Sequence, residues 1–269
     1  MTTSQPLSNS HTRKHECALA VMAKAPRAGE VKTRLVPPLD HEEAAALSAC
    51  FLADTAVNMA TVAAEHGADC VAVYTPVGAE ETLSQLLPAN FSLLAQHGAT
   101  LGDRLLRATE ELLARGYKSV CLINGDTPTL PPVCLAAAVE ALRRPGERVV
   151  LGPADDGGYY LIGLKRAHSS LFTDIPWSTA GVCALTVERA REIDLAVELL
   201  RPWYDLDDAT SLSRLCDELF AANGEFNART DHAGYEAPHT HDYLARIIAT
   251  GGRERIWPNA TATSIRLST

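Results

Sequence analysis

One carboxylate, Asp126, ends the apolar run of "LINGDTPTL" at residues 122–130. An unpaired carboxylate is costly in an apolar setting, so this side chain must reach water, a hydrogen-bond donor or a cation. An Asp before Thr-Pro can cap a turn. Alternatively, it can bind a hard cation such as Mg²⁺, with nucleotide phosphates completing the ion's shell.

A second source of carboxylates is "WYDLDDATSL" at residues 203–212, which contains Asp205, Asp207 and Asp208. The segment precedes a predicted helix, so either Asp207 or Asp208 is expected to be its N-cap. The remaining carboxylates are then available as metal ligands. This segment and Asp126 together predict a site for Mg²⁺ or Mn²⁺.

A basic segment, "AKAPRAGEVKTRL", follows the first predicted strand at residues 23–35. Its cations and the glycine between them are Lys24, Arg27, Gly29, Lys32 and Arg34. Lysines and arginines on a flexible loop directly after a strand suit the binding of a phosphate chain. The alternative is a solvated basic loop. The segment is not a Walker A loop, because it has no G-K-[ST] triplet.

A third polar segment, "PADDGGYY" at residues 153–160, joins two predicted strands. It could be a hairpin turn and nothing more. It could also face a substrate, with Asp156 as a general base or as a ligand of an acceptor hydroxyl. The other residues predicted to bind the acceptor are Asp155, Gly157, Gly158 and Tyr159.

Short apolar strands alternate with longer helices along the chain, which favours an α/β fold with a mostly parallel sheet and helices on both faces. The expected strands cover 17–23, 69–75, 91–96, 119–125, 148–153 and 159–164, and the expected helices 41–65, 102–116, a segment from 131, 180–193 and 208–222. Ligands of such sheets bind beyond the carboxyl ends of the strands. We therefore expect a carboxylate of Asp207, or failing that Asp205, within about 7 Å of Asp126.

The 269 residues suffice for one large domain, predicted at 17–250, with polar tails at 1–16 and 251–269. A net charge of −9 without blocks of like charge argues against a nucleic-acid partner. Seven dispersed cysteines favour a reducing, cytoplasmic compartment. No apolar run approaches the roughly 18 residues that span a bilayer, so no membrane association is predicted.

Six motifs occur in order across the chain: "AKAPRAGEVKTRLVPPL", "LGDRLLRA", "NGDTPTLPP", "LGPADDGGYYLIGL", "LFTDIPWST" and "WYDLDD". Together they closely resemble the DUF2064 family, also described as selenodomain-associated or arsenosugar-biosynthesis glycosyltransferases. The resemblance implies a GT-A-type fold, the three-layer sandwich of the nucleotide-diphospho-sugar transferases. The arrangement is also similar to phospholactate guanylyltransferase.

The resemblance implies a phosphate-binding role for Lys24, Lys32 and Arg34, and makes Asp126 the strand-end metal ligand. "DLDDATSL" is similar to the D-x-D-T-x-x-D-L segment of related nucleotidyltransferases, in which Asp207 matches the metal-facing aspartate. The chain departs from that pattern, because an aspartate replaces the threonine and a serine replaces the second acidic residue.

Three functions are compatible with these features. The first is glycosyl transfer from a nucleoside-diphosphate sugar to a small-molecule acceptor, with a divalent ion stabilising the departing diphosphate. The second is nucleotidyl transfer with release of pyrophosphate, which a larger set of cations would suit. The third is a non-catalytic nucleotide-binding module. The family resemblance favours glycosyl transfer, and the sequence does not predict an oligomeric state.

Overall fold

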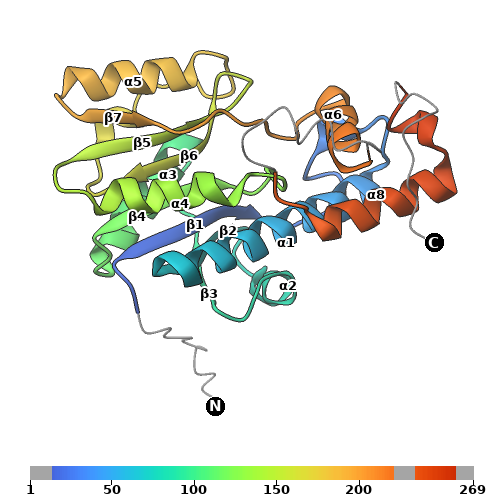
Figure 1. The fold of residues 1–269 in the computed structure, drawn as a ribbon, viewed down its shortest axis with the longest axis horizontal. Coiled ribbons are helices and arrows are strands. Elements are labelled where there is room, and N and C mark those ends of the chain that lie inside the picture. The colour runs from blue at the N-terminus through green and yellow to red at the C-terminus, as the bar shows by residue number, and fades with distance from the viewer. Residues whose placement is uncertain (1–13, 221–233, 259–269) are drawn as a thin grey trace.

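The computed structural model describes residues 14–220 and 234–258 (Figure 1). Within them, seven strands form one sheet in the order β3-β2-β1-β4-β6-β5-β7. Strand β6 is antiparallel to its neighbours β4 and β5, and the other pairs are parallel, as predicted. The strands are β1 (Cys17–Lys24), β2 (Ala68–Thr75), β3 (Phe91–Ala95), β4 (Ser119–Asn124), β5 (Arg148–Pro153), β6 (Tyr159–Leu164) and β7 (Ala196–Leu199).

Helices cover both faces of this sheet, which gives the predicted three-layer α/β sandwich. One face carries α1, α2 and α4 together with α6 and α8, which lie side by side at one end of the molecule in Figure 1. The other face carries α3 and α5. The helices are α1 (His41–His66), α2 (Glu80–Leu86), α3 (Leu101–Ala114), α4 (Pro132–Arg143), α5 (Val182–Glu192), α6 (Ala209–Phe220) and α8 (Pro238–Gly251).

The two-residue period of a strand divides the core between these layers. In β1, Leu19 and Val21 pack on the α1 face, whereas Ala18 and Ala20 pack on the α3 face. Helix α1 is long and apolar enough to cross a membrane by length and composition, contrary to the expectation from apolar runs alone. Because 61% of its most apolar window is buried inside the fold, α1 is a core helix in this structure.

Each predicted strand and helix is present, with ends within a few residues of the expected ones. Strand β7 was not predicted. Its four residues lie at the sheet edge and are exposed or half-buried, so the sequence lacks the apolar alternation that identifies a strand.

The packed chain also continues past the expected boundary at residue 250. Ile256 and Trp257 are buried, and the Trp257 indole Nε1 donates to Asp217 Oδ1 at 2.6 Å. This contact joins the end of the described chain to α6.

The last helix, α8, is anchored by a carboxylate from another helix. Asp54 of α1 is fully buried, and its two oxygens accept the backbone N–H groups of His239 and Thr240 at 3.1 and 2.8 Å. Ala237, at the N-cap position, supplies no side-chain bond. Asp54 therefore satisfies N–H groups that the helix itself cannot pair.

Replacing Asp54 with alanine should destabilise the protein by about 2–4 kcal/mol, because two charge-assisted hydrogen bonds at a helix N-terminus are lost. Urea unfolding measures this difference. The matched control is Asp242→Ala, which removes an exposed carboxylate of the same helix and should leave the free energy of unfolding nearly unchanged. Equal effects of the two substitutions would show that Asp54 does not anchor α8.

Candidate active site

Four polar segments meet at the edge where the parallel strands end. They follow β1 (25–32), β4 (125–130) and β7 (200–208), or join β5 to β6 (154–158). Backbone hydrogen bonds connect them: Asp155 N–H donates to Trp203 O at 2.9 Å, and Leu206 N–H donates to Asp126 O at 3.1 Å. The segment after β7 thus crosses the sheet edge from β5 to β4.

The ammonium group of Lys32 connects two of the predicted carboxylates. Its Nζ lies 2.6 Å from Asp126 Oδ2 and 3.2 Å from Asp207 Oδ1. These two oxygens therefore lie no more than 5.8 Å apart, which confirms the expected proximity of Asp126 and Asp207. Burial alone would lower the pKa of Lys32, but the charges and hydrogen bonds of both aspartates outweigh it and raise this pKa.

The rest of the basic loop borders the same edge. Lys32 has a left-handed backbone with φ 46°, an uncommon conformation for a residue with a side chain. The Arg34 guanidinium pairs with Asp207 Oδ2, and the Lys24 ammonium donates to the Glu30 carbonyl at 2.6 Å. Two of the three cations predicted to bind phosphate therefore contact carboxylates.

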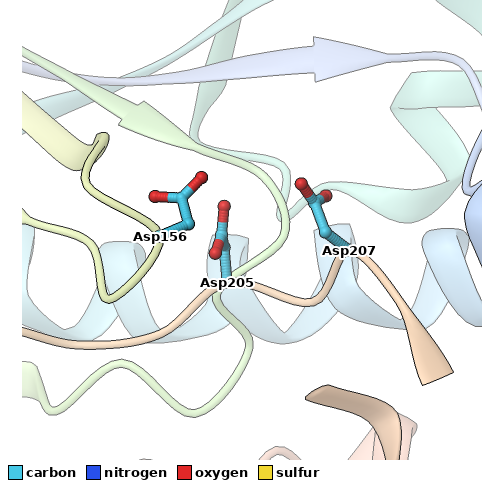
Figure 2. Close-up of side chains that lie close together, drawn as sticks. All are labelled: Asp156, Asp205 and Asp207. Carbon is cyan, nitrogen blue, oxygen red and sulfur yellow. The ribbon is translucent and has the colours of Figure 1, made fainter. Parts of the chain in front are cut away.

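A cluster of carboxylates lies beside this pair. One ligand oxygen each from Asp156, Asp205 and Asp207 lies within 4.8 Å of the others. Figure 2 shows the three side chains pointing to the same side, with Asp205 between the other two. The sequence predicted Asp205 and Asp207 as metal ligands but assigned Asp156 to the acceptor. Asp156 belongs to the cluster because the β5–β6 turn that carries it lies against the end of β4, where Asn124 Nδ2 donates to Tyr159 O.

The chemistry of the cluster suits a divalent cation. Burial, together with the charges of Asp126, Asp156 and Asp207, raises the pKa of Asp205 to about 7. Asp126, which was also predicted as a ligand, is not one of the three grouped carboxylates. It lines both cavities, and its buried Oδ1 has no hydrogen-bond partner among the described residues. Three grouped carboxylates beside an unpartnered carboxylate oxygen fit a hard ion such as Mg²⁺ or Mn²⁺.

The third acid of this segment, Asp208, has a structural role. Its Oδ1 accepts the N–H of Ser211 at 2.8 Å, the contact of a helix cap, and this bond lowers the pKa of Asp208. Of the two residues expected to cap α6, Asp208 is therefore the one that does so. Asp205 and Asp207 remain available as metal ligands.

Two adjoining cavities, of about 290 and 370 Å³, share a wall that includes Asp126, Asp207, Lys24 and Arg34. The smaller one lies against the basic loop. The larger one extends between α3 and α5 and has mixed polar and apolar walls. Its residues outside the shared wall include Gln96, Leu101, Arg104, Leu105, Asn124, Asp156, Gly158, Tyr159, Trp177, Thr179, Val182 and Asp205.

Three predicted residues are not among those that line these cavities. Asp155 instead pairs with Arg214 of α6, its Oδ2 lying 2.6 Å from Nη1. Gly157 packs its backbone against Ala180 so closely that an added Cβ would lie 2.0 Å from the Ala180 oxygen. Gly29 has φ 75° and open space around it.

Several cavity residues were not singled out from the sequence. Asn124 ends β4 and donates from Nδ2 to Tyr159 O at 3.2 Å, and Gln96 follows β3 and donates to Val73 O at 2.7 Å. Both lie at the carboxyl end of a parallel strand, a position that could have identified them. Trp177 is far from any strand end along the chain, and its ring meets edge-on that of Tyr159, the first residue of β6, with 6.3 Å between the ring centroids.

Comparison with known proteins gives matches of different strength. None of the curated proteins compared with the chain matches it at a significant level. The structure of CMP:2-keto-3-deoxy-manno-octonic acid synthetase complexed with CTP is 11% identical over 74% of this chain and 96% of its own, with a TM-score of 0.49. A cytidylyltransferase from Leptospira borgpetersenii serovar Hardjo-bovis (strain JB197) is 11% identical over 92% and 98%, also at 0.49. Both likenesses are too low to transfer a substrate or a metal.

Two matches are stronger. The family model described as "uncharacterized protein conserved in bacteria (DUF2064)" matches residues 58–179. A crystal structure from Desulfovibrio desulfuricans G20, provisionally named a nucleotide-diphospho-sugar transferase, is 30% identical, covers 87% of this chain and 96% of its own, and has a TM-score of 0.74. The chain therefore belongs to the DUF2064 family and has the fold of the nucleotide-diphospho-sugar transferases.

Proposed function

We propose that this protein is a metal-dependent glycosyltransferase that takes a sugar from a nucleoside diphosphate and transfers it to a small-molecule acceptor. In this reaction the bond between the sugar's anomeric carbon and the diphosphate breaks, and the diphosphate leaves with the electron pair. A bond to the acceptor oxygen forms, and the acceptor hydroxyl loses its proton. The name of the similar Desulfovibrio protein supports the choice of donor.

The observation that carries the proposal is the carboxylate cluster beside a basic loop. Asp156, Asp205 and Asp207 would hold Mg²⁺ or Mn²⁺, and the orphaned oxygen of Asp126 would complete the protein's share of the donors. A bound divalent ion would offset the negative charge that develops on the departing diphosphate. Transferases of this kind need cation and phosphate subsites side by side, and the adjoining cavities suit both.

Lys24 and Arg34 are the residues we assign to the diphosphate, because they border both cavities. Lys32 lies between Asp126 and Asp207, and its positive charge offsets part of their repulsion and keeps the two carboxylates close together. Asp156 is the exposed member of the cluster, so an acceptor hydroxyl can approach it. One of its oxygens already accepts the Gly158 N–H at 2.8 Å, which leaves the other for ion or acceptor.

Nucleotidyl transfer is the alternative. The number of cations in the basic segment favours nucleotidyl transfer, because a triphosphate carries more negative charge than a diphosphate. In the structure, Lys32 pairs with both Asp126 and Asp207, so of the three cations predicted to bind phosphate, Lys24 and Arg34 are left for the nucleotide. Two cations suit the shorter phosphate chain better than three would.

Incubation of the purified protein and Mg²⁺ or Mn²⁺ with a panel of nucleotide sugars and nucleoside triphosphates tests the proposal. We expect slow release of a nucleoside diphosphate from at least one sugar donor, with water as the acceptor. Asp126→Asn should abolish this release while leaving the circular dichroism spectrum and melting temperature nearly intact. Release of pyrophosphate from a triphosphate would instead establish nucleotidyl transfer.

A second prediction concerns the pH dependence of stability. The pKa of Asp205 is about 7 in the folded protein, above its ordinary value of 3.8, so between these pH values the native state binds more protons than the unfolded state. This contribution to stability is fully present below about pH 4 and is lost as the pH rises through about 7. The ion-free protein is therefore destabilised at pH 8.

Asp205→Asn removes this ionisation, so the ion-free variant should be more stable than the wild type at pH 8, and the difference should vanish near pH 4. Urea unfolding in a chelator at both pH values measures it. Mn²⁺ affinity should fall in the same variant. A variant less stable than wild type at pH 8 would contradict the raised pKa of Asp205. Asp242→Asn, on the exposed side of α8, is the control.

A further inference from the structure

One arginine outside the cavities contacts the neighbours of two cluster residues. Arg214 Nη1 lies 2.6 Å from Asp155 Oδ2, and the guanidinium carbon lies 3.9 Å from the centre of the Tyr204 ring. Asp155 directly precedes Asp156, and Tyr204 directly precedes Asp205. A single side chain thus connects the two segments that carry these carboxylates.

The Tyr204 ring is also held at its other end. Its hydroxyl donates to Glu218, which lies one helical turn after Arg214 on α6, and Thr129 Oγ1 donates to the same hydroxyl at 3.3 Å. Tyr204 is 3% exposed, so the ring has a fixed position between α6 and the segment after β4. Arg214 therefore stacks on a rigid surface.

The β5–β6 turn is held on both sides of Asp156, which is itself exposed. Asp155 N–H donates to Trp203 O, Cys183 N–H donates to Gly157 O at 2.9 Å, and Gly157 packs against Ala180. The ion pair between Asp155 and Arg214 adds a side-chain contact from α6 at the residue before the Asp156 carboxylate. This contact links the turn to the helix that also holds Tyr204.

The ion pair contributes little to stability. The side chains of Arg214 and Asp155 are 41% and 48% exposed, and pairs at that exposure are worth about 0–1 kcal/mol. Metal ligands tolerate much less displacement, and removal of a residue that orients a ligand typically weakens metal affinity by about 10- to 100-fold. The expected loss is thus in ion binding rather than in folding.

We propose that Arg214 is a positioning residue, which sets the distance between Asp156 and Asp205 through its contacts with Asp155 and Tyr204. This inference rests on the proposed function, because its consequence is the geometry of the ion site. It also assigns Asp155, expected from the sequence to bind the acceptor, to the support of its neighbour.

Mn²⁺ binding to the full-length protein, measured by electron paramagnetic resonance and calorimetry, tests the inference. Arg214→Gln should weaken Mn²⁺ affinity about tenfold, with a melting temperature close to that of the wild type. Asp155→Asn should also weaken Mn²⁺ affinity, and the double variant should be no weaker than Arg214→Gln, because Arg214→Gln already removes the ion pair together with the contact to the Tyr204 ring. The matched control is Arg115→Gln, which breaks a pair of similar exposure at the C-terminal end of α3, with side chains 44% and 40% exposed.

Unchanged Mn²⁺ affinity in Arg214→Gln, or additive losses in the double variant, would overturn the inference. Failure of the proposed function gives a different result, namely a wild-type protein that binds no Mn²⁺. In that case crystal structures of the wild type and Arg214→Gln decide: a displaced Asp156 carboxylate supports the positioning role, and an unmoved one refutes it.

Discussion

The cost of holding partly buried carboxylates close together is the constraint on which this site depends. Asp126, Asp156, Asp205 and Asp207 come from three segments of the chain and meet at one edge of the sheet. Burial of Asp205, together with the charges of Asp126, Asp156 and Asp207, favours its protonated form and raises its pKa. The fold offsets part of this cost with Lys32, whose buried ammonium contacts two of the four. The part of this cost that Lys32 does not offset destabilises the ion-free site, and such a loss of stability is common where a protein keeps a binding site.

The sequence predicted the layers and the location of the site better than the contacts within it. Strands and helices have local periods, and the carboxyl ends of parallel strands lie at one edge, so the proximity of Asp126 and Asp207 could be inferred. The pairing of Lys32 with these two carboxylates could not, because several cations and carboxylates come to the same edge and the sequence does not show which of them meet. Neighbouring residues of a turn also point in different directions. Asp156 faces the cluster and Asp155 faces Arg214, although both occupy the same "ADDGG" segment.

The loop after β1 illustrates a second limit. Its cations identified a phosphate-binding segment, but a count of charges does not show which of them pair internally. Lys32 lies in the left-handed region of backbone space, where a side chain is disfavoured unless tertiary contacts compensate. Its two carboxylate contacts supply that compensation. The backbone conformation of the loop and the charge distribution of the site are therefore coupled, and neither follows from the local sequence.

The antiparallel strand β6 explains how so many carboxylates reach one edge. A parallel connection from β5 would leave this edge through a crossover and return at the opposite one. Because β6 reverses direction, the β5–β6 turn stays at the edge where β4 ends, and Ile123 of β4 pairs with Leu161 of β6. The chain after β7 then follows this turn through the Ala154–Trp203 bridge and continues to Asp126. Asp156 and Asp205 thus lie on adjacent segments, and one reversed strand suffices to bring the turn, the β7 extension and the β4 loop together.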